Sequence, residues 1–163
     1  MPARRTMMEG GFMDQTAFKV DYDPRYVNAG FFKALGDPTR LRLMVALAAF
    51  DCNLCVCELV YGLKIPQYRA SKHLAVLSKH GLVTSSHRGT WVMYSASPNL
   101  PAAFDACMKS LGEAEPYRTD IQRIADRRLL RDDQGLCAVG FVPEEQIDAL
   151  IARARSKPTA IRR

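Results

Sequence analysis

Three of the chain's five cysteines lie within the ten-residue stretch DCNLCVCELV, residues 51–60. They are Cys52, Cys55 and Cys57, spaced as C-x2-C-x-C. Thiolates are the ligands that soft metal and metalloid ions prefer, and thiols are also the groups that undergo redox chemistry. An odd number of cysteines does not suit a complete set of structural disulfides. The spacing therefore predicts an ion-binding or thiol-redox site.

A second feature is a long block without acidic residues. No Asp or Glu occurs from Leu59 to Phe104, and the net charge of the whole chain is +6. The same block carries five basic residues and all three histidines: Lys64, Arg69, Lys72, Lys79, Arg88, His73, His80 and His87. A solvated helix face usually mixes both signs of charge. A basic, acid-free block of this length indicates a polyanionic partner, most often nucleic acid.

Length and composition set the class of protein. The chain has 163 residues, of which 48% are hydrophobic and 25% charged. These values predict one soluble domain, with or without an extension. No apolar run approaches the roughly 18 residues that span a bilayer. The basic pair in MPARRTMMEGGFMDQT is not followed by the apolar stretch of a secretory signal. We therefore expect a cytoplasmic protein with no membrane partner.

The hydrophobic periodicity predicts mainly helices with one small β-hairpin. Asp37-Pro38 is a typical helix start, and Gly36, Gly62 and Gly81 are expected helix ends. In LVTSSHRGTWVMYSAS the period changes to two on either side of residues 87–90, which predicts the hairpin. The expected helices are residues 24–35, 38–50, 53–61, 66–80, 98–111, 120–131 and 143–155. This order is that of a winged helix-turn-helix, in which helix 66–80 would enter the major groove.

Three segments in this order carry a resemblance to a known family: FFKALGDPTRLRLMVAL, NLCVCELV and PQYRASKHLAVLSKHGLVTSSHRGTWVMYS. Together they resemble the ArsR/SmtB family of metal-responsive repressors, from about residue 24 to about residue 112. The resemblance implies a homodimer with a seam built from helices 24–35 and 98–111, bound to double-stranded operator DNA, and no enzymatic activity. We expect residues 1–20 to form a flexible arm, 21–112 the DNA-binding and dimerisation domain, and 113–163 a helical extension of unknown role.

The family's recognition helix corresponds to residues 66–80. Glutamine reads adenine, Arg and Lys read guanine or pair with phosphate, and Ser adapts to either. At the hairpin tip, Arg88 would reach the minor groove or the backbone. The candidate DNA-binding residues are Gln67, Tyr68, Arg69, Ser71, Lys72, His73 and Arg88. Leu74, Ala75, Leu77 and Leu82 are expected to face the core.

The segment LCVCEL resembles the inducer-binding helix of two branches of the family, one responsive to As(III) and Sb(III), the other to Cd and Pb. The second branch takes further cysteines from an N-terminal arm, and residues 1–51 contain none. The arsenic branch has C-x-C and a third Cys downstream, where Val60 stands here. The expected metal ligands are therefore Cys52, Cys55 and Cys57, with As(III) or Sb(III) as inducer and no cofactor for DNA binding.

The spacing bears on mechanism. On an ideal helix Cys52 and Cys55 are about 60° apart, whereas Cys57 is more than about 100° from either. If the three thiols lie on one helix, a soft ion must bind where the first turn is loose or must unwind that turn. Distorting this helix would displace helix 66–80. A thiol-redox or persulfide sensor, bridging Cys52 and Cys55, stays open as an alternative, as does a Cd/Pb sensor.

Other ligands and chemistries fit the sequence less well. Zinc sensing is not expected, because helix 98–111 offers only Asp105 of the acid and histidine residues that the zinc branch uses there. An enzyme that uses a reactive cysteine is not expected either, because such a cysteine needs a catalytic His or acid partner and we identify none near the cluster. Cys107 is expected to be a buried small hydrophobe. Cys137 is expected to be either a buried small hydrophobe or an auxiliary thiol.

Overall fold

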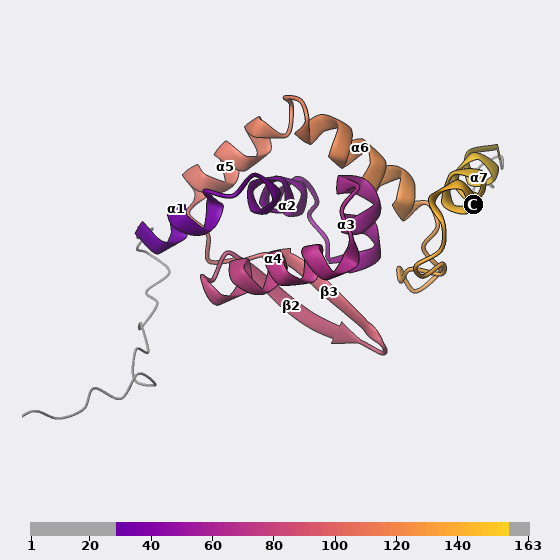
Figure 1. The fold of residues 1–163 in the computed structure, drawn as a ribbon, viewed down its shortest axis with the longest axis horizontal. Helices are drawn as coiled ribbons and strands as arrows, with labels where there is room; N and C mark the ends of the chain where they lie inside the picture. Colours follow the sequence, from indigo (N-terminus) through magenta and orange to yellow (C-terminus); the bar gives the residue numbers. More distant parts are fainter. Residues whose placement is uncertain (1–28, 157–163) are drawn as a thin grey trace, which may run out of the picture.

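The computed structural model describes residues 29–156, which fold into seven helices and a small sheet (Figure 1). In chain order the elements are α1 (Ala29–Leu35), α2 (Pro38–Ala49), β1 (Leu54–Cys55), α3 (Val56–Leu63), α4 (Gln67–Lys79), β2 (Val83–Arg88), β3 (Trp91–Ala96), α5 (Ala102–Leu111), α6 (Tyr117–Arg128) and α7 (Glu144–Ser156). None of the helices in this described part is long and apolar enough to cross a membrane.

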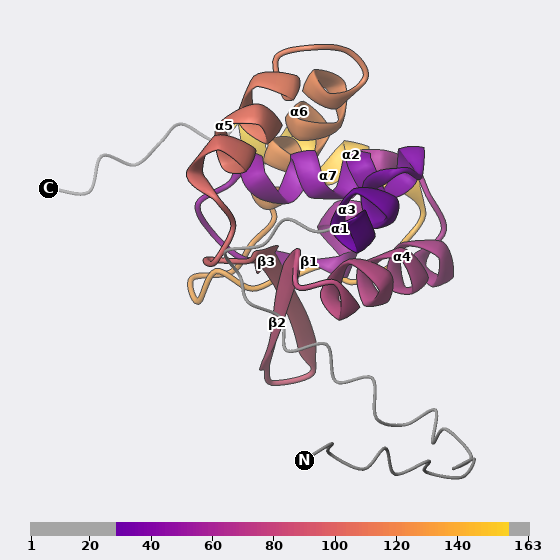
Figure 2. The same cartoon turned by 90° about the vertical axis from the view of Figure 1, so that its left-hand side faces the viewer.

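Helix α2 is the centre of the core. Its start is the predicted one: the Asp37 side chain accepts a hydrogen bond of 2.9 Å from the Arg40 N–H, and Pro38 occupies the first turn. The six consecutive residues from Leu43 to Ala48 are all buried. Figure 2 shows why, since α5 and α6 lie on one side of α2, and α4 and the sheet on the other.

The predicted winged helix-turn-helix is confirmed. Helices α3 and α4 form the pair, and the β2–β3 hairpin follows them at the same edge of the molecule (Figure 1). The hairpin strands extend further than predicted, because Arg88 still pairs with Trp91 and only Gly89-Thr90 forms the turn. Gly89 has a φ of +59°, which favours glycine in such a two-residue turn.

A two-residue strand, β1, was not predicted. It lies on the far side of β3, so the sheet order is β1-β3-β2, with all pairs antiparallel. Leu54 is opposite Tyr94, and Cys55 is opposite Met93. The strand occupies residues expected to be helical, so the prediction of a helix from residue 53 is wrong: α3 begins at Val56.

The predicted role of Gly62 is also wrong. Helix α3 continues through it to Leu63, and Lys64 ends the helix in the left-handed conformation with a φ of 55°. Gly62 instead allows α6 to approach closely. A Cβ at this position would collide with Ile124 and lie 3.1 Å from the Asp120 carbonyl oxygen.

The C-terminal extension packs on the helix-turn-helix domain. Helix α6 contacts α2 and α3, and α7 contacts α6 (Figure 1). Arg42 of α2 donates two hydrogen bonds of 2.7 Å to the buried Asp120 carboxylate, which anchors α6.

Other predicted boundaries shift. Helix 98–111 begins only at Ala102, after Pro98 and Pro101, and helix 120–131 lies at 117–128. The predicted helix 143–155 is found at 144–156. Residues 24–28 of the first predicted helix and the predicted arm at 1–20 lie outside the described residues.

Candidate thiol site and nucleic-acid interface

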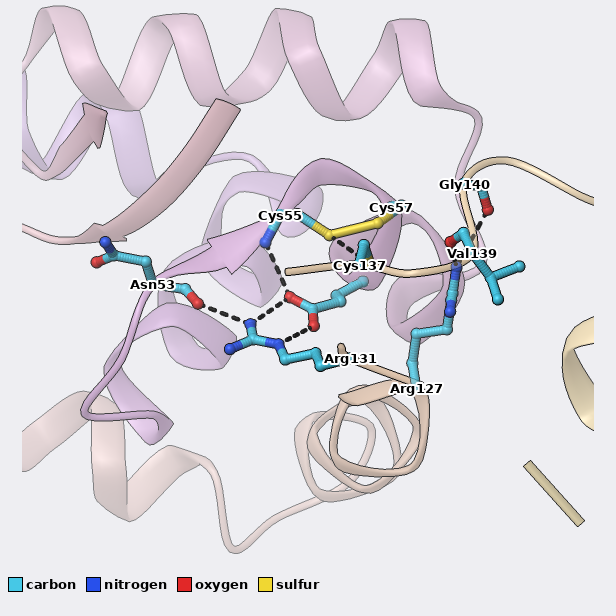
Figure 3. The surroundings of a disulfide bond; sticks show 9 residues. Asn53, Cys55, Cys57, Arg127, Arg131, Cys137, Val139 and Gly140 are labelled. Carbon is cyan, nitrogen blue, oxygen red and sulfur yellow. Dashed lines mark hydrogen bonds and ion pairs between the residues drawn. A yellow bond between two sulfur atoms is a disulfide. The ribbon is translucent and has the colours of Figure 1, made fainter. Parts of the chain in front are cut away.

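Three sulfur atoms meet where the sheet, α3 and the extension come together. The Sγ atoms of Cys55, Cys57 and Cys137 lie within 4.8 Å of one another, and each of the three residues is less than 5% exposed. Cys55 and Cys57 are joined as a disulfide, and Cys137 Sγ lies 3.0 Å from Cys55 Sγ (Figure 3). With Met93 they form a small core of their own, against which Trp91 and Leu136 pack.

Local structure explains why Cys55 and Cys57 converge. Cys55 is the N-cap of α3 in an extended conformation, so it is not on the helix at all. Its N–H donates a 2.8 Å hydrogen bond to Oε2 of Glu58, three residues into the first turn. The angular argument for a single helix therefore does not apply, because a strand residue and a helix residue turn their sulfurs to one point.

A buried ion pair fixes the extension beside this turn. The Glu58 carboxylate is fully buried and accepts hydrogen bonds of 2.6 and 2.7 Å from Nε and Nη2 of Arg131. Nη2 of Arg131 also donates to the Asn53 carbonyl oxygen at 2.8 Å. Arg131 forms a β-bridge with Cys137, so the ion pair holds the backbone of Cys137 at the start of α3 (Figure 3).

Cys137 is electrostatically distinct. Burial raises the pKa of its thiol to about 11, and the neighbouring Glu58 carboxylate adds to the increase. The guanidinium groups of Arg127 and Arg131 oppose this rise without cancelling it. The Cys137 thiol therefore keeps its proton at neutral pH in this state, and an ion that binds it must displace that proton.

Two other cysteines lie elsewhere. Cys52 is half-buried against the main core and lines a different cavity, so the structure does not bring it to the other sulfurs. Cys107 is exposed in this chain, contrary to the expectation of a buried position. The reason is that α5 buries Met108, and Cys107, one residue earlier, is rotated about 100° onto the outer face.

The face of α4 opposite the core is polar and exposed. Its exposed residues include five of the predicted DNA-binding side chains: Gln67, Tyr68, Arg69, Ser71 and Lys72. Leu74, Leu77 and Leu82 are buried as predicted, whereas Ala75 is exposed, because it is the next residue round the helix from Leu74.

The remaining two predicted DNA-binding residues differ in setting. Arg88 is exposed at the end of β2, beside the hairpin turn. His73 is half-buried, and its Nδ1 lies 3.7 Å from Oδ1 of Asp37, the N-cap of α2. The structure therefore gives His73 a contact within the domain as well as a place near the exposed face of α4.

Comparison with known proteins identifies the family of the helix-turn-helix region. Residues 37–85 match the family described as "Bacterial regulatory protein, arsR family". The arsenic resistance transcriptional regulator ArsR1 of Pseudomonas putida KT2440 is 39% identical over 97 residues, which cover 58% of this chain and 75% of that protein. The arsenical resistance operon repressor of Escherichia coli K12 is 32% identical over 111 residues, covering 66% and 92% respectively. The chain belongs to the ArsR family.

Membership makes this protein a transcriptional regulator of a helix-turn-helix family and not an enzyme. Among solved structures, reduced HlyU from Vibrio cholerae is similar, with a TM-score of 0.45 and 29% identity over 53% of this chain and 86% of that one. The residues that match the ArsR family include Cys55, Cys57 and the whole of α4, but not Cys137. The third sulfur of this ArsR-family protein comes from the extension.

The sequence contained only a faint signal for Cys137. It lies in the irregular segment DDQGLCAVGF, where the Asp132 side chain accepts from the N–H groups of Gln134 and Leu136 and Gly135 has a φ of +73°. An Asp and a Gly at these positions indicate a tight turn. They do not indicate which of the distant elements the turn will face.

Proposed function

We propose that this ArsR-family protein is a repressor that leaves operator DNA when As(III) or Sb(III) binds the thiolates of Cys55, Cys57 and Cys137. The observation that carries the proposal is the group of three buried sulfurs within 4.8 Å. Cys55 and Cys57 supply thiolates to the ion once their disulfide is reduced to two thiols. No fourth His, Cys, Asp or Glu joins this group among residues 29–156. Structural zinc sites are almost always four-coordinate, so a ligand set of three thiols favours a trivalent, thiophilic ion.

The DNA-binding part of the proposal rests on α4 and the hairpin. The exposed side chains on α4 would meet base edges and phosphates; they are Gln67, Tyr68, Arg69, Ser71 and Lys72. His73 would contact the DNA backbone beside them, and Arg88 would reach the flanking groove. We further propose a homodimer through α1 and α5, because Phe32 of α1 is 62% exposed and α5 buries only Met108. Two copies would read half-sites about 34–36 Å apart.

The coupling between the two sites is short. Cys55 lies in β1, which pairs with β3 of the hairpin, and it caps α3, which packs on α4. An ion that joins Cys55 and Cys57 to Cys137 would tie the wing and the start of α3 to the extension. If the DNA-bound arrangement of these elements differs from the ion-bound one, the two ligands compete by linkage. Ion binding therefore need not unwind the first turn of α3, as the sequence suggested, because Cys55 already lies outside that helix.

Serine substitutions test the proposal. In the fully reduced protein, Cys55→Ser, Cys57→Ser and Cys137→Ser should bind the operator as the unsubstituted protein does but fail to release it with arsenite. Release is measured by the fluorescence anisotropy of a labelled duplex from the promoter of the protein's own operon. Cys52→Ser and Cys107→Ser are the matched controls and should respond normally. Normal release of Cys137→Ser would contradict the ligand assignment.

A second candidate, a thiol-redox sensor, is favoured by the Cys55–Cys57 disulfide. This differs from the Cys52–Cys55 bridge expected from the sequence. Two thiols and one molecule of peroxide would give the disulfide and two molecules of water. Under this alternative peroxide, and not arsenite, would release DNA, and Cys137→Ser would retain the response. Anaerobic titration of the reduced protein with arsenite, then with peroxide, separates the two functions.

A further inference from the structure

A separate cavity of about 220 Å³ lies between the helix-turn-helix pair and the extension. Val60 of α3 and Ile65 form part of its wall, and Phe141, Val142 and Ile147 form the opposite part. All five are apolar, so the walls suit the body of a small organic molecule. Its volume limits that body to about one aromatic ring or a short branched chain.

The polar side chains of the lining are those of Tyr61, Lys64, Glu144 and Arg127, and among them only Arg127 of α6 is fully buried. Its Nη2 donates to the carbonyl oxygens of Val139 and Gly140 (Figure 3). Within residues 29–156, its Nε and Nη1 have no hydrogen-bond acceptor and its charge has no carboxylate partner. A buried cation in this condition is costly unless an anion reaches it.

Two other arginines at this junction each have the carboxylate partner that Arg127 lacks. Arg42 donates two hydrogen bonds to the Asp120 carboxylate, and Arg131 donates two to Glu58. Lys64, which also lines the cavity, pairs with Glu144. Arg127 is thus the cation of this lining that has no counter-ion in the described part of the chain.

We propose that the cavity binds a small organic monoanion, an apolar body carrying a carboxylate that accepts hydrogen bonds from Arg127. The apolar walls favour an organic acid over an inorganic oxyanion, and the guanidinium favours an anion over a neutral molecule of the same shape. The bound acid would contact α3, α6 and the segment before α7 together. Because Cys57 also lines the cavity, the occupant would lie next to the thiol site and act as a second effector.

Benzoate, cyclohexanecarboxylate and 3-methylbutanoate serve as probes, with benzamide as the neutral isostere of benzoate. Binding is measured by isothermal titration calorimetry and thermal shift on the full chain without arsenite or DNA, so the result is independent of the proposed function. The reductant is dithiothreitol, because a carboxylated phosphine would compete. At least one carboxylate should bind with a millimolar or lower dissociation constant, and benzamide at least about tenfold more weakly than benzoate.

Two variants locate the site. Arg127→Gln removes the charge, and Val142→Trp fills the cavity while keeping Arg127. The Val142→Trp variant still tests the proposal if Arg127→Gln fails to fold. Both should lose benzoate binding by about tenfold or more, whereas Arg118→Gln, which removes an exposed charge from the same helix, should not. Equal binding of benzoate and benzamide, no binding of any carboxylate, or undiminished binding by folded Val142→Trp would each overturn the proposal.

Discussion

At the scale of single residues, the thiol site depends on the protonation of Cys137. Burial and the Glu58 carboxylate raise the pKa of the thiol to about 11. The consequences differ for the two kinds of ion that three thiols could hold. Arsenous acid brings three hydroxides, which leave as water with the three thiol protons, so its binding releases no net proton. A divalent cadmium ion brings none, so every protonated thiol that it binds releases a proton.

The two ions should therefore differ in their dependence on pH. From about pH 6 to about pH 8, Cys137 stays protonated, and its share alone makes cadmium affinity rise about tenfold per pH unit. Arsenite affinity should stay nearly constant over the same range. Competitive titration of the reduced protein measures both, and Cys137→Ser should reduce the cadmium slope by about one. A cadmium slope that is unchanged in Cys137→Ser would show that this thiol does not bind the ion.

At the scale of elements, the Glu58–Arg131 pair holds the extension against α3. Glu58 is fully buried and Arg131 is 15% exposed, and the carboxylate also caps the N–H of Cys55. One interaction thus determines both where α3 begins and where Cys137 lies. Its loss would leave a buried carboxylate without a cationic partner, which is far costlier than the loss of an exposed ion pair.

Arg131→Met tests this role. The substitution should lower the free energy of unfolding by about 3–5 kcal/mol, because Glu58 stays buried and unpaired. It should also weaken arsenite binding, since Cys137 loses its anchor. The control is Arg118→Met, which breaks an exposed pair with Glu115 and should cost less than about 1 kcal/mol. Urea denaturation of both variants gives the values, and similar losses in the two would refute a structural role for the buried pair.

The same element-scale contacts explain which parts could be predicted from sequence. Helix α2 was predictable from Asp37-Pro38 and its apolar run, and the hairpin from its alternation around Gly89, because these signals are local. The strand β1 was not, since two residues carry no period and Cys55 becomes a strand residue only by pairing with Met93. The meeting of Cys55 with Cys137 spans 82 residues and depends on how α6 docks, which no local pattern encodes.

At the scale of the whole molecule, the proposed DNA-binding surface and the thiol site occupy different regions. Helix α4 and the hairpin lie along one edge, while the sulfurs lie where the sheet, α3 and the extension meet (Figures 1 and 3). A dimer of this protein would present each exposed basic side chain of α4 and the hairpin twice to the operator. Substitutions on α4 should therefore change DNA affinity without changing the affinity for arsenite.

Lys72→Ala measures the electrostatic part of this interface. Each lost phosphate contact should reduce the slope of log affinity against log salt by about 0.9, hence by about 1.8 for a dimer. Arsenite binding to the free protein should be unaffected. Arg118→Ala, an exposed arginine on α6, is the control for a general loss of charge. A salt slope unchanged by Lys72→Ala would place the phosphate contacts elsewhere.

The most direct measurement is the number of sulfur atoms bound to arsenic, obtained by X-ray absorption spectroscopy of the reduced protein loaded with one equivalent of arsenite. We expect three sulfurs in the unsubstituted protein and in Cys52→Ser, and two sulfurs with one oxygen in Cys137→Ser. Three sulfurs retained in Cys137→Ser, together with a loss in Cys52→Ser, would contradict a site completed by the extension.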